Sequence, residues 1–173
     1  MTWHLETERL RLRPMRMDDL DAFHEVIGDR HSMRFYPWAF TRDMARRWIE
    51  QTFERYERDG FGLLAVEERA TGEMVGDCGA TIQSVDGEPF VELGWHVRRD
   101  RQGRGYATEA GGACRDEAWR VVDPDLLISL IRPENVASWT VARRLGFRPW
   151  RGTVRAGMGH IVWRLDRPVV GSA

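Results

Sequence analysis

A glycine-containing loop is the segment of this sequence with the clearest chemical signal. The residues Gln102-Gly103-Arg104-Gly105-Tyr106-Ala107 lie between a predicted strand that ends at Val97 and a predicted helix that begins near Gly105. The first N–H groups of a helix have no intrahelical acceptor, and glycines let a ligand approach the backbone closely. The loop also carries side chains that can pair with phosphates, namely Arg98, Arg99, Arg101 and Arg104. It therefore predicts a site for a phosphate-bearing ligand, with a simple turn as the alternative.

Two familiar nucleotide-binding patterns do not fit this loop. A P-loop needs a lysine after its second glycine, but all 26 basic residues of this chain are arginines. The dinucleotide fingerprint needs a third glycine where Thr108 stands, and it follows the first strand of a βαβ unit. The strand before this loop is instead the third of three consecutive strands. The missing lysine also excludes any mechanism that depends on a catalytic lysine.

The elements that must position this loop follow from hydrophobic periodicity and turn signals. The expected order is β-α-α-β-β-β-α-β-α-β-β, which is an α+β fold. We expect strands at 10–14, 62–67, 74–83, 90–97, 126–131, 147–154 and 161–165, and helices at about 18–30, 42–58, 105–121 and 136–145. Thr41 is expected to cap the second helix, and Asp86–Gly87 to form a hairpin turn. Gly94, inside a strand, predicts a bulge or a close backbone approach.

Length and composition predict one globular domain. The chain has 173 residues, of which 42% are hydrophobic and 31% charged. We expect a single domain over residues 1–173, with a core at about 7–166 and a short C-terminal tail from about Pro168. Residues 1–13 carry charges throughout and no apolar run reaches 18 residues, so we expect neither a signal peptide nor a membrane helix.

The two cysteines and the net charge limit the function further. Cys78 and Cys114 lack the spacing of a zinc site, so we expect no metal and two buried thiols in a reducing cytoplasm. The net charge of −1 does not indicate nucleic-acid binding. Residues 61–97 hold one arginine and seven acidic residues, whereas residues 98–173 hold 14 arginines and eight acidic residues. These segments could hold a cationic ligand beside a polyanionic one, or they could be solvated faces.

Four ordered motifs resemble one known superfamily. Gln102-x-x-Gly105-x-Ala107 resembles the acyl-CoA pyrophosphate loop of the GNAT N-acetyltransferases. The segments Thr7–Pro14, Gly105–Ala110 and Asn135-x-x-Ser138, the last followed by Leu145-Gly146-Phe147, resemble the ribosomal-protein N-acetyltransferase (RimJ/RimL-type) branch. Together the motifs span residues 7–166, nearly the whole chain.

The resemblance implies a mixed, splayed central sheet of about seven strands flanked by about four helices, with acetyl-CoA in a cleft. The pantetheine arm would run along the strand 93–97, and the pyrophosphate would lie on the amides of residues 102–108. The cofactor-binding residues implied in this way are Trp95, His96, Val97, Gln102, Gly103, Arg104, Gly105, Tyr106, Ala107, Thr108, Asn135 and Ser138.

An amine that attacks a thioester must first be neutral, so a base has to remove a proton. We expect Glu92 to be this base, unless it is a solvent-facing strand residue. Backbone N–H groups at 95–97 could polarise the carbonyl. Many relatives place a tyrosine at the position of Ala142, and Ser138 is our substitute as proton donor to the leaving thiolate, unless it only bonds the helix backbone. Attack would be direct, because neither cysteine has an evident histidine partner.

The acceptor site is expected on the aromatic-rich loop before the second helix. Tyr36 and Trp38 could form the wall of an amine site, with the acidic segment attracting the amine, or they could be a small packed cluster under the loop. His96 and His160 are read as structural strand histidines. The expected activity is acetyl transfer from acetyl-CoA to a protein N-terminal α-amine or a small amine. The alternative is a non-catalytic acyl-CoA sensor or interaction module. A homodimer and a longer acyl group are compatible with the sequence.

Overall fold

The computed structural model describes residues 3–168, and residues 169–173 of the expected tail lie outside them. The predicted order of seven strands and four helices is confirmed, with one additional two-residue strand at the start. The elements are β1 (Leu5–Glu6), β2 (Leu10–Pro14), α1 (Leu20–Ile27), α2 (Arg42–Asp59), β3 (Leu63–Glu68), β4 (Met74–Val85), β5 (Glu88–Val97), α3 (Tyr106–Glu117), β6 (Leu126–Ile131), α4 (Val136–Arg144), β7 (Arg148–Arg155) and β8 (Met158–Asp166). The fold is a single α+β domain.

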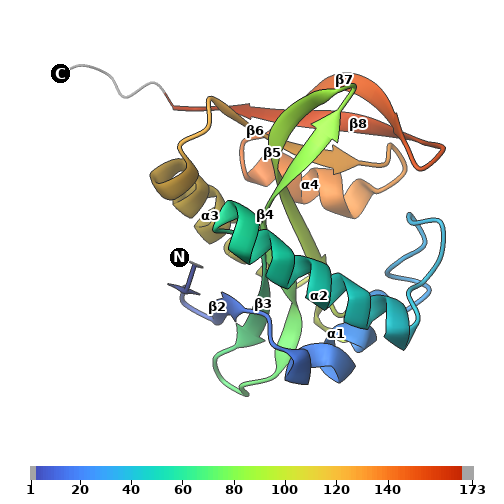
Figure 1. Ribbon diagram of the computed structural model, residues 1–173, viewed down its shortest axis with the longest axis vertical. Coiled ribbons are helices and arrows are strands. Elements are labelled where there is room, and N and C mark those ends of the chain that lie inside the picture. Colours follow the sequence, from blue (N-terminus) through green and yellow to red (C-terminus); the bar gives the residue numbers. More distant parts are fainter. Residues whose placement is uncertain (1–2, 169–173) are drawn as a thin grey trace.

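The strands form one eight-stranded sheet with the order β1-β2-β3-β4-β5-β6-β8-β7. Neighbouring strands are antiparallel except β5 and β6, which run parallel. These two strands pair only at Val91 with Leu127 and at Glu92 with Ile128, and they diverge beyond Glu92. The predicted mixed and splayed sheet is therefore present, and the divergence separates β1–β5 from the half that holds β6–β8 and α4 (Figure 1).

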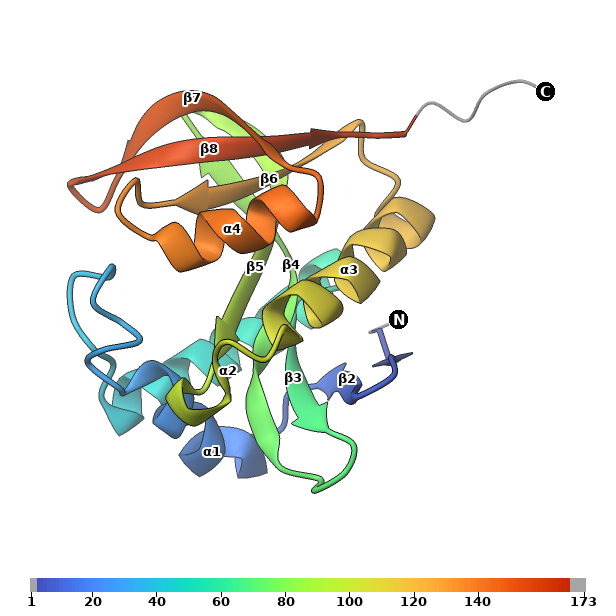
Figure 2. The same ribbon diagram turned by 180° about the vertical axis from the view of Figure 1, so that it is seen from behind.

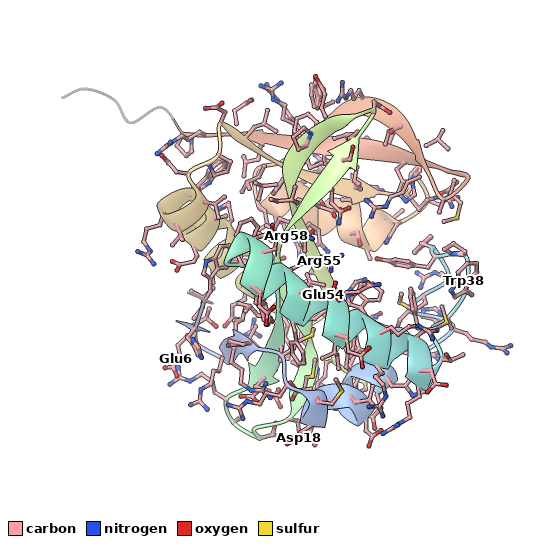
Figure 3. All side chains as sticks on the ribbon, in the orientation of Figure 1. Glu6, Asp18, Trp38, Glu54, Arg55 and Arg58 are labelled. Atoms are coloured by element: carbon pink, nitrogen blue, oxygen red, sulfur yellow. The ribbon has the colours of Figure 1, made fainter. Side chains whose placement is uncertain are left out.

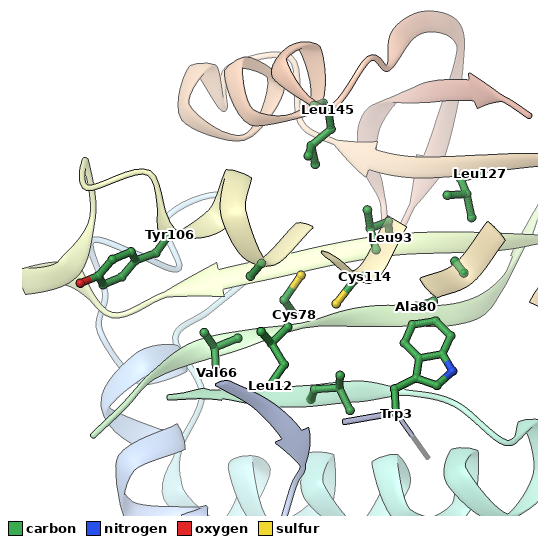
Figure 4. Packing of buried hydrophobic residues seen from close by; sticks show 14 of the residues in the cluster. Trp3, Leu12, Val66, Cys78, Ala80, Leu93, Tyr106, Cys114, Leu127 and Leu145 are labelled. Carbon is green, nitrogen blue, oxygen red and sulfur yellow. The ribbon is translucent and has the colours of Figure 1, made fainter. Parts of the chain in front are cut away.

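Helices cover both faces of the sheet. Helices α1 and α2 lie on one face, and α3 and α4 lie on the other, as the two opposite views show (Figures 1 and 2). The core under α3 includes Cys78 and Leu93 from the sheet and Ala110 and Cys114 from the helix, all at most 2% exposed (Figure 4). The small side chains on this face of α3 let the helix pack closely on the sheet. The second core cluster lies under α1 and α2.

Several local signals act as their residue types predict. The Thr41 side chain accepts a hydrogen bond from the N–H of Met44 at 3.3 Å and so caps α2. Asp86 and Gly87 have φ of 52° and 89°, the left-handed pair that a two-residue hairpin turn requires. The bulge predicted at Gly94 is wrong, because Gly94 pairs with Gly79 in an unbroken β4–β5 register. The sheet opens through the divergence of β5 from β6 instead.

Candidate functional site

A cleft of about 690 Å³ lies at the divergence of β5 and β6. Its walls come from the loop between α1 and α2, from α2, from β5, from the loop before α3, from the start of α4 and from the β7–β8 hairpin. The lining residues that the sequence singled out are Tyr36, Glu92, Trp95, His96, Val97, Gln102, Gly103, Gly105, Tyr106, Ala107, Thr108, Asn135 and Ser138. The expected site residues that do not line it are Trp38 and three arginines of the loop, Arg98, Arg99 and Arg104.

The backbone before α3 offers a row of unpaired donors. Gly103 and Gly105 have φ of 75° and 85°, left-handed values that glycine adopts without strain. The first helical bond runs from the N–H of Glu109 to the carbonyl of Gly105 at 3.0 Å, and no residue within 3–168 accepts from the N–H groups of residues 103–108. The Thr108 hydroxyl is also buried without a partner among these residues. Such a concentration of free donors at a helix start suits a phosphate group.

The row of free N–H groups, which we call the cradle, is one residue shorter than the expected range 102–108. The N–H of Gln102 already donates to the carbonyl of Arg99 at 3.3 Å, and its side-chain amide donates to the carbonyl of Val97 at 2.9 Å. Gln102 therefore braces the loop against the end of β5. Within the loop 102–108, the backbone N–H groups that no described residue accepts therefore begin at Gly103, and these are the ones that can bind a ligand.

Most of the arginines near the loop are already neutralised. Arg98 pairs with Asp100 at 2.7 Å and with Glu73 at 3.1 Å, and Arg101 pairs with Glu73 at 2.9 Å. Arg99 lies 3.7 Å from Asp29. The expectation that these three arginines hold phosphates is therefore not supported. Arg104 has no ion pair within residues 3–168.

The first motif of the chain holds the start of α3 in place. The Glu109 carboxylate accepts from the Thr7 hydroxyl at 2.6 Å and from the backbone N–H of Arg9 at 2.9 Å, and it pairs with the Arg9 guanidinium at 2.6 Å. Arg9 also donates to the carbonyl of Arg104 at 2.9 Å. Two motifs about 100 residues apart in the sequence thus fix the position of the glycine loop.

The late-helix motif forms the cap of α4. The Asn135 side chain accepts from the N–H of Ser138 at 3.1 Å and so serves as the N-cap. The Ser138 side chain lines the cleft. Ala142 is fully buried on the same helix. Asn135 therefore has a structural role, and Ser138 is the hydroxyl that α4 presents at this position.

Glu92 lies at the last residue pair before β5 and β6 separate. Its Oε1 accepts from the N–H of Leu130 at 3.2 Å, and the side chain lines the cleft. Burial raises the pKa of Glu92, and the nearby charge of Arg155 opposes this effect without cancelling it. Glu92 is thus a half-buried cleft residue and not a solvent-facing strand residue. A raised pKa suits a carboxylate that takes up a proton.

Tyr36 and His96 were expected at the site separately, but the sequence did not reveal that they form a connected polar group with Asp77. The Nε2 of His96 lies 2.7 Å from the Tyr36 hydroxyl, and the Nδ1 lies 3.0 Å from Oδ1 of Asp77, which is fully buried. Burial lowers the pKa of His96, but Asp77 and Tyr36 outweigh it and place the pKa well above the ordinary value. A signal was available, because the two-residue turn at Asp86–Gly87 sets Asp77 opposite His96 in the register.

Aromatic side chains surround this group of three. The Trp48 ring of α2 lies edge-on to the His96 ring with centroids 5.8 Å apart, and the Phe40 ring lies 4.9 Å from the Trp48 ring. Tyr36 lines the cleft, as predicted for the aromatic loop. Trp38 does not, because its side chain is 59% exposed at the outer edge of the molecule (Figure 3). Of the two aromatic residues expected at the acceptor site, Tyr36 lines the cleft and Trp38 does not, whereas Trp48 lines it as well.

The charge of the cleft differs from the charge of the acidic segment. Glu67, Glu73 and Glu88 pair with arginines elsewhere, and Glu92 is the one acidic side chain of residues 61–97 that lines the cleft. Arg55, on α2 (Figure 3), and Arg155 also line it, and neither forms an ion pair with another described residue. The acidic segment therefore does not give the cleft a net negative charge.

No group of three histidine, cysteine, aspartate or glutamate side chains within residues 3–168 is arranged to hold a metal ion. No helix of the described chain is long and apolar enough to cross a membrane. His160 lines the cleft with its Nδ1 at 2.9 Å from the carbonyl of Met158.

Comparison with known proteins identifies relatives over most of the chain. The family described as the acetyltransferase (GNAT) domain matches residues 9–148. An uncharacterized protein of Bacillus subtilis (strain 168), YkkB, is 32% identical over 143 residues, which are 82% of this chain and 83% of YkkB. A crystal structure of an acetyltransferase from Agrobacterium tumefaciens superposes with a TM-score of 0.81 at 29% identity over 95% of both chains. Mycobacterium smegmatis RimJ in complex with CoA-disulfide gives 0.70 at 24% identity over 91% of this chain and 81% of RimJ, a likeness of fold.

Proposed function

Because the chain belongs to the GNAT acetyltransferase family, we propose that it transfers an acetyl group from acetyl-CoA directly to a primary amine. One observation carries the proposal: the free N–H groups of residues 103–108 belong to a segment that lines a cleft, and the cleft opens where β5 loses its second neighbour. GNAT acetyltransferases use acetyl-CoA, and the donors present here suit its diphosphate. The proposal includes a cytoplasmic location, in line with the two free, buried cysteines.

The coenzyme would follow the divergence of the two strands. The diphosphate would accept from the amides of residues 103–108 and from the Thr108 hydroxyl. The pantetheine arm would lie along residues 93–97 of β5, which pair with β4 but not with β6. The thioester would then lie between Glu92 and the start of α4, where Ser138 lines the cleft.

The residues near the thioester suit proton transfer. Glu92 would take a proton from the amine, and the nitrogen lone pair would form the new bond to the acetyl carbon as the thiolate leaves. Ser138 would donate a proton to that thiolate and regain one from solvent in the cleft, in the absence of a tyrosine at position 142. The backbone N–H groups of residues 95–97 would polarise the thioester carbonyl. Neither buried cysteine takes part.

The acceptor is a protein N-terminal α-amine or a small amine. The RimJ/RimL-like motifs and the fold likeness to RimJ favour the first. Arg55 and Arg155 beside Glu92 disfavour an acceptor with several positive charges, such as a polyamine, because like charges repel in a confined site.

Coenzyme binding is tested by calorimetric titration with acetyl-CoA. Gly105→Glu should abolish binding, since its carboxylate would repel the diphosphate at the cradle. The control is Gly72→Glu, which also places a side chain at a positive φ, of 73°, with no atom within 4 Å of its Cβ. Equal binding by both variants would contradict the assignment of the loop.

The reaction is tested by release of free thiol from acetyl-CoA over a panel of N-terminal peptides and small amines. Turnover on at least one acceptor, with the acetyl group found on nitrogen by mass spectrometry, is the expected result. Tight coenzyme binding without turnover on any amine would instead favour the non-catalytic acyl-CoA module, for which the buried Ala142 is the supporting observation.

A further inference from the structure

Tyr36, His96 and Asp77 connect the cleft to a fully buried carboxylate. Tyr36 lies on the loop before α2, His96 on β5 and Asp77 on β4. The Tyr36 side chain is 38% exposed and lines the cleft, whereas Asp77 is 0% exposed. The two links are 2.7 Å and 3.0 Å long, both within hydrogen-bond range. These three hydrogen-bonded side chains therefore connect the solvent, at Tyr36, to the core, at Asp77.

The carboxylate of Asp77 decides which group donates and which accepts in the two hydrogen bonds. An ionised Asp77 can only accept, so the Nδ1 of His96 carries a proton and donates to it. In the neutral ring Nε2 is then the basic nitrogen, and it accepts from the Tyr36 hydroxyl. The lone pairs of the Tyr36 oxygen remain available to a ligand in the cleft.

We propose that Tyr36, His96 and Asp77 form a second proton-accepting site for the acceptor amine, separate from Glu92. This inference rests on the proposed acetyl transfer. The amine proton moves to the Tyr36 oxygen as the hydroxyl proton of Tyr36 moves to Nε2 of His96. The ring becomes an imidazolium that Asp77 neutralises, and the phenol stays uncharged. Tyr36 is the catalytic residue of this site, and His96 and Asp77 are positioning residues behind it.

The position of the site supports a division of roles. Glu92, Gly94 and His96 lie on one face of β5, because alternate residues of a strand share a face. Glu92 and His96 are four residues apart, about 13 Å along the strand. A Cβ on Gly94 would meet nothing within 4 Å, so open space lies between the two groups. An amine that arrives as an ammonium ion must lose two protons, and it meets one acceptor on each side of Gly94.

The charges that act on His96 are few. Asp77 faces it from β4 and Tyr36 from the loop, and both raise its pKa. Glu92 on β5 responds to the charge of His96. The α2 helix presents the uncharged Trp48 ring, and α1 contributes Val26 to the cleft wall. Protonation of His96 below its pKa blocks the transfer, so the rate should rise as the pH passes upward through that value.

The first experiment measures pH–rate profiles with the best amine of the acceptor panel. Tyr36→Phe should lower kcat about 100-fold, a typical share of one acid–base group, and should remove the ascending limb assigned to His96. Asp77→Asn should move that limb to lower pH, because it removes the charge that raises the pKa of His96. The control is His4→Gln, an exposed histidine that does not line the cleft, which should keep the wild-type profile. A Tyr36→Phe profile like that of wild type would overturn the proposal.

The second experiment needs no substrate, and its measurement is made on the wild-type protein. An NMR titration of the histidine rings of the wild-type protein should show a proton on Nδ1 of neutral His96 and a titration above the ordinary pKa. His96→Gln assigns the resonance. A neutral ring protonated on Nε2, or titration at the ordinary value, would refute the proposed proton relay of Tyr36, His96 and Asp77.

The two experiments separate this inference from the proposed function. If wild-type protein acetylates no amine but the ring titrates as expected, the proposed function fails while the geometry of the relay stands. If amines are acetylated and Tyr36→Phe keeps both rate and profile with unchanged acetyl-CoA affinity, the relay fails and acetyl transfer stands.

Discussion

At the scale of single residues, the ion pair of His96 and Asp77 links stability to pH. The folded pKa of His96 is raised above its ordinary value, so the pair stabilises the fold fully below the unfolded pKa of about 6.5. This stabilisation is lost as the pH rises through the folded pKa. Asp77→Asn should therefore lower the free energy of unfolding by about 1–3 kcal/mol at pH 6 and by less at pH 9. Urea denaturation at both pH values measures this, and an equal loss at both would show that the pair is not ionised.

The role of the Glu92 carboxylate can be tested through the catalytic rate constant. Burial raises its pKa, and the carboxylate form is the one that accepts a proton. Glu92→Gln should lower kcat about 10²–10⁴-fold and leave the affinity for acetyl-CoA unchanged. The matched control is Glu54→Gln on the exposed side of α2, which should behave as wild type. A rate within twofold of wild type would remove Glu92 from the mechanism.

The sequence was a good guide to residues that act through the backbone and a poor one to residues that act through side-chain contacts. The glycine loop could be located because its spacing identifies it, whereas Glu92 was singled out by its strand position together with the family resemblance. The phosphate role expected for Arg98 and Arg101 finds no support in the structure, because a carboxylate distant in the sequence, Glu73, pairs with both in the fold. Trp38 was expected in the cleft wall and does not line it, because the conformation of its loop, which the sequence does not reveal, leaves the residue 59% exposed.

At the scale of elements, two glycines of the β4–β5 hairpin allow an effect on packing to be separated from an effect on function. Gly79 and Gly94 are cross-strand neighbours. A Cβ on Gly79 would lie 2.3 Å from the carbonyl oxygen of Gly62, whereas one on Gly94 would meet nothing within 4 Å. Gly79→Ala should destabilise the protein by about 1–3 kcal/mol or more, since backbone must move. Gly94→Ala should keep the melting temperature.

Gly94→Ala should nevertheless impair the reaction, because its methyl group would project into the cleft. We expect KM for the amine to rise several-fold while acetyl-CoA still binds. Thermal denaturation and steady-state kinetics on both variants measure these effects. Unaltered kinetics for Gly94→Ala would show that the acceptor does not pass over this residue.

Element types and order were predictable because each helix and strand carries its own periodicity and caps. Thr41 and the Asp86–Gly87 turn are examples of signals read correctly. Strand β1 was not predictable, because two residues are too few for any period. The splaying of the sheet was expected from the family resemblance alone, because the divergence of β5 from β6 depends on how two separate parts of the chain pack.

At the scale of the whole molecule, two halves of one sheet meet at two residue pairs between β5 and β6. A ligand that contacts both the loop before α3 and the start of α4 would join the halves. At 100 times its Kd, acetyl-CoA should stabilise the protein by about 2.7 kcal/mol. For a chain of this size the melting temperature should rise by about 5–11 °C. Calorimetric scans with and without acetyl-CoA test this, and Gly105→Glu should show no shift.

The divergence has one more consequence. Beyond Glu92, β5 has hydrogen-bonding groups on one side that no neighbouring strand satisfies, which makes it an edge strand in the middle of a sheet. Unsatisfied edges recruit other extended chains and promote aggregation. A coenzyme lying along this edge would also shield it, so light scattering during storage at 37 °C should increase more slowly when CoA is present than when it is absent.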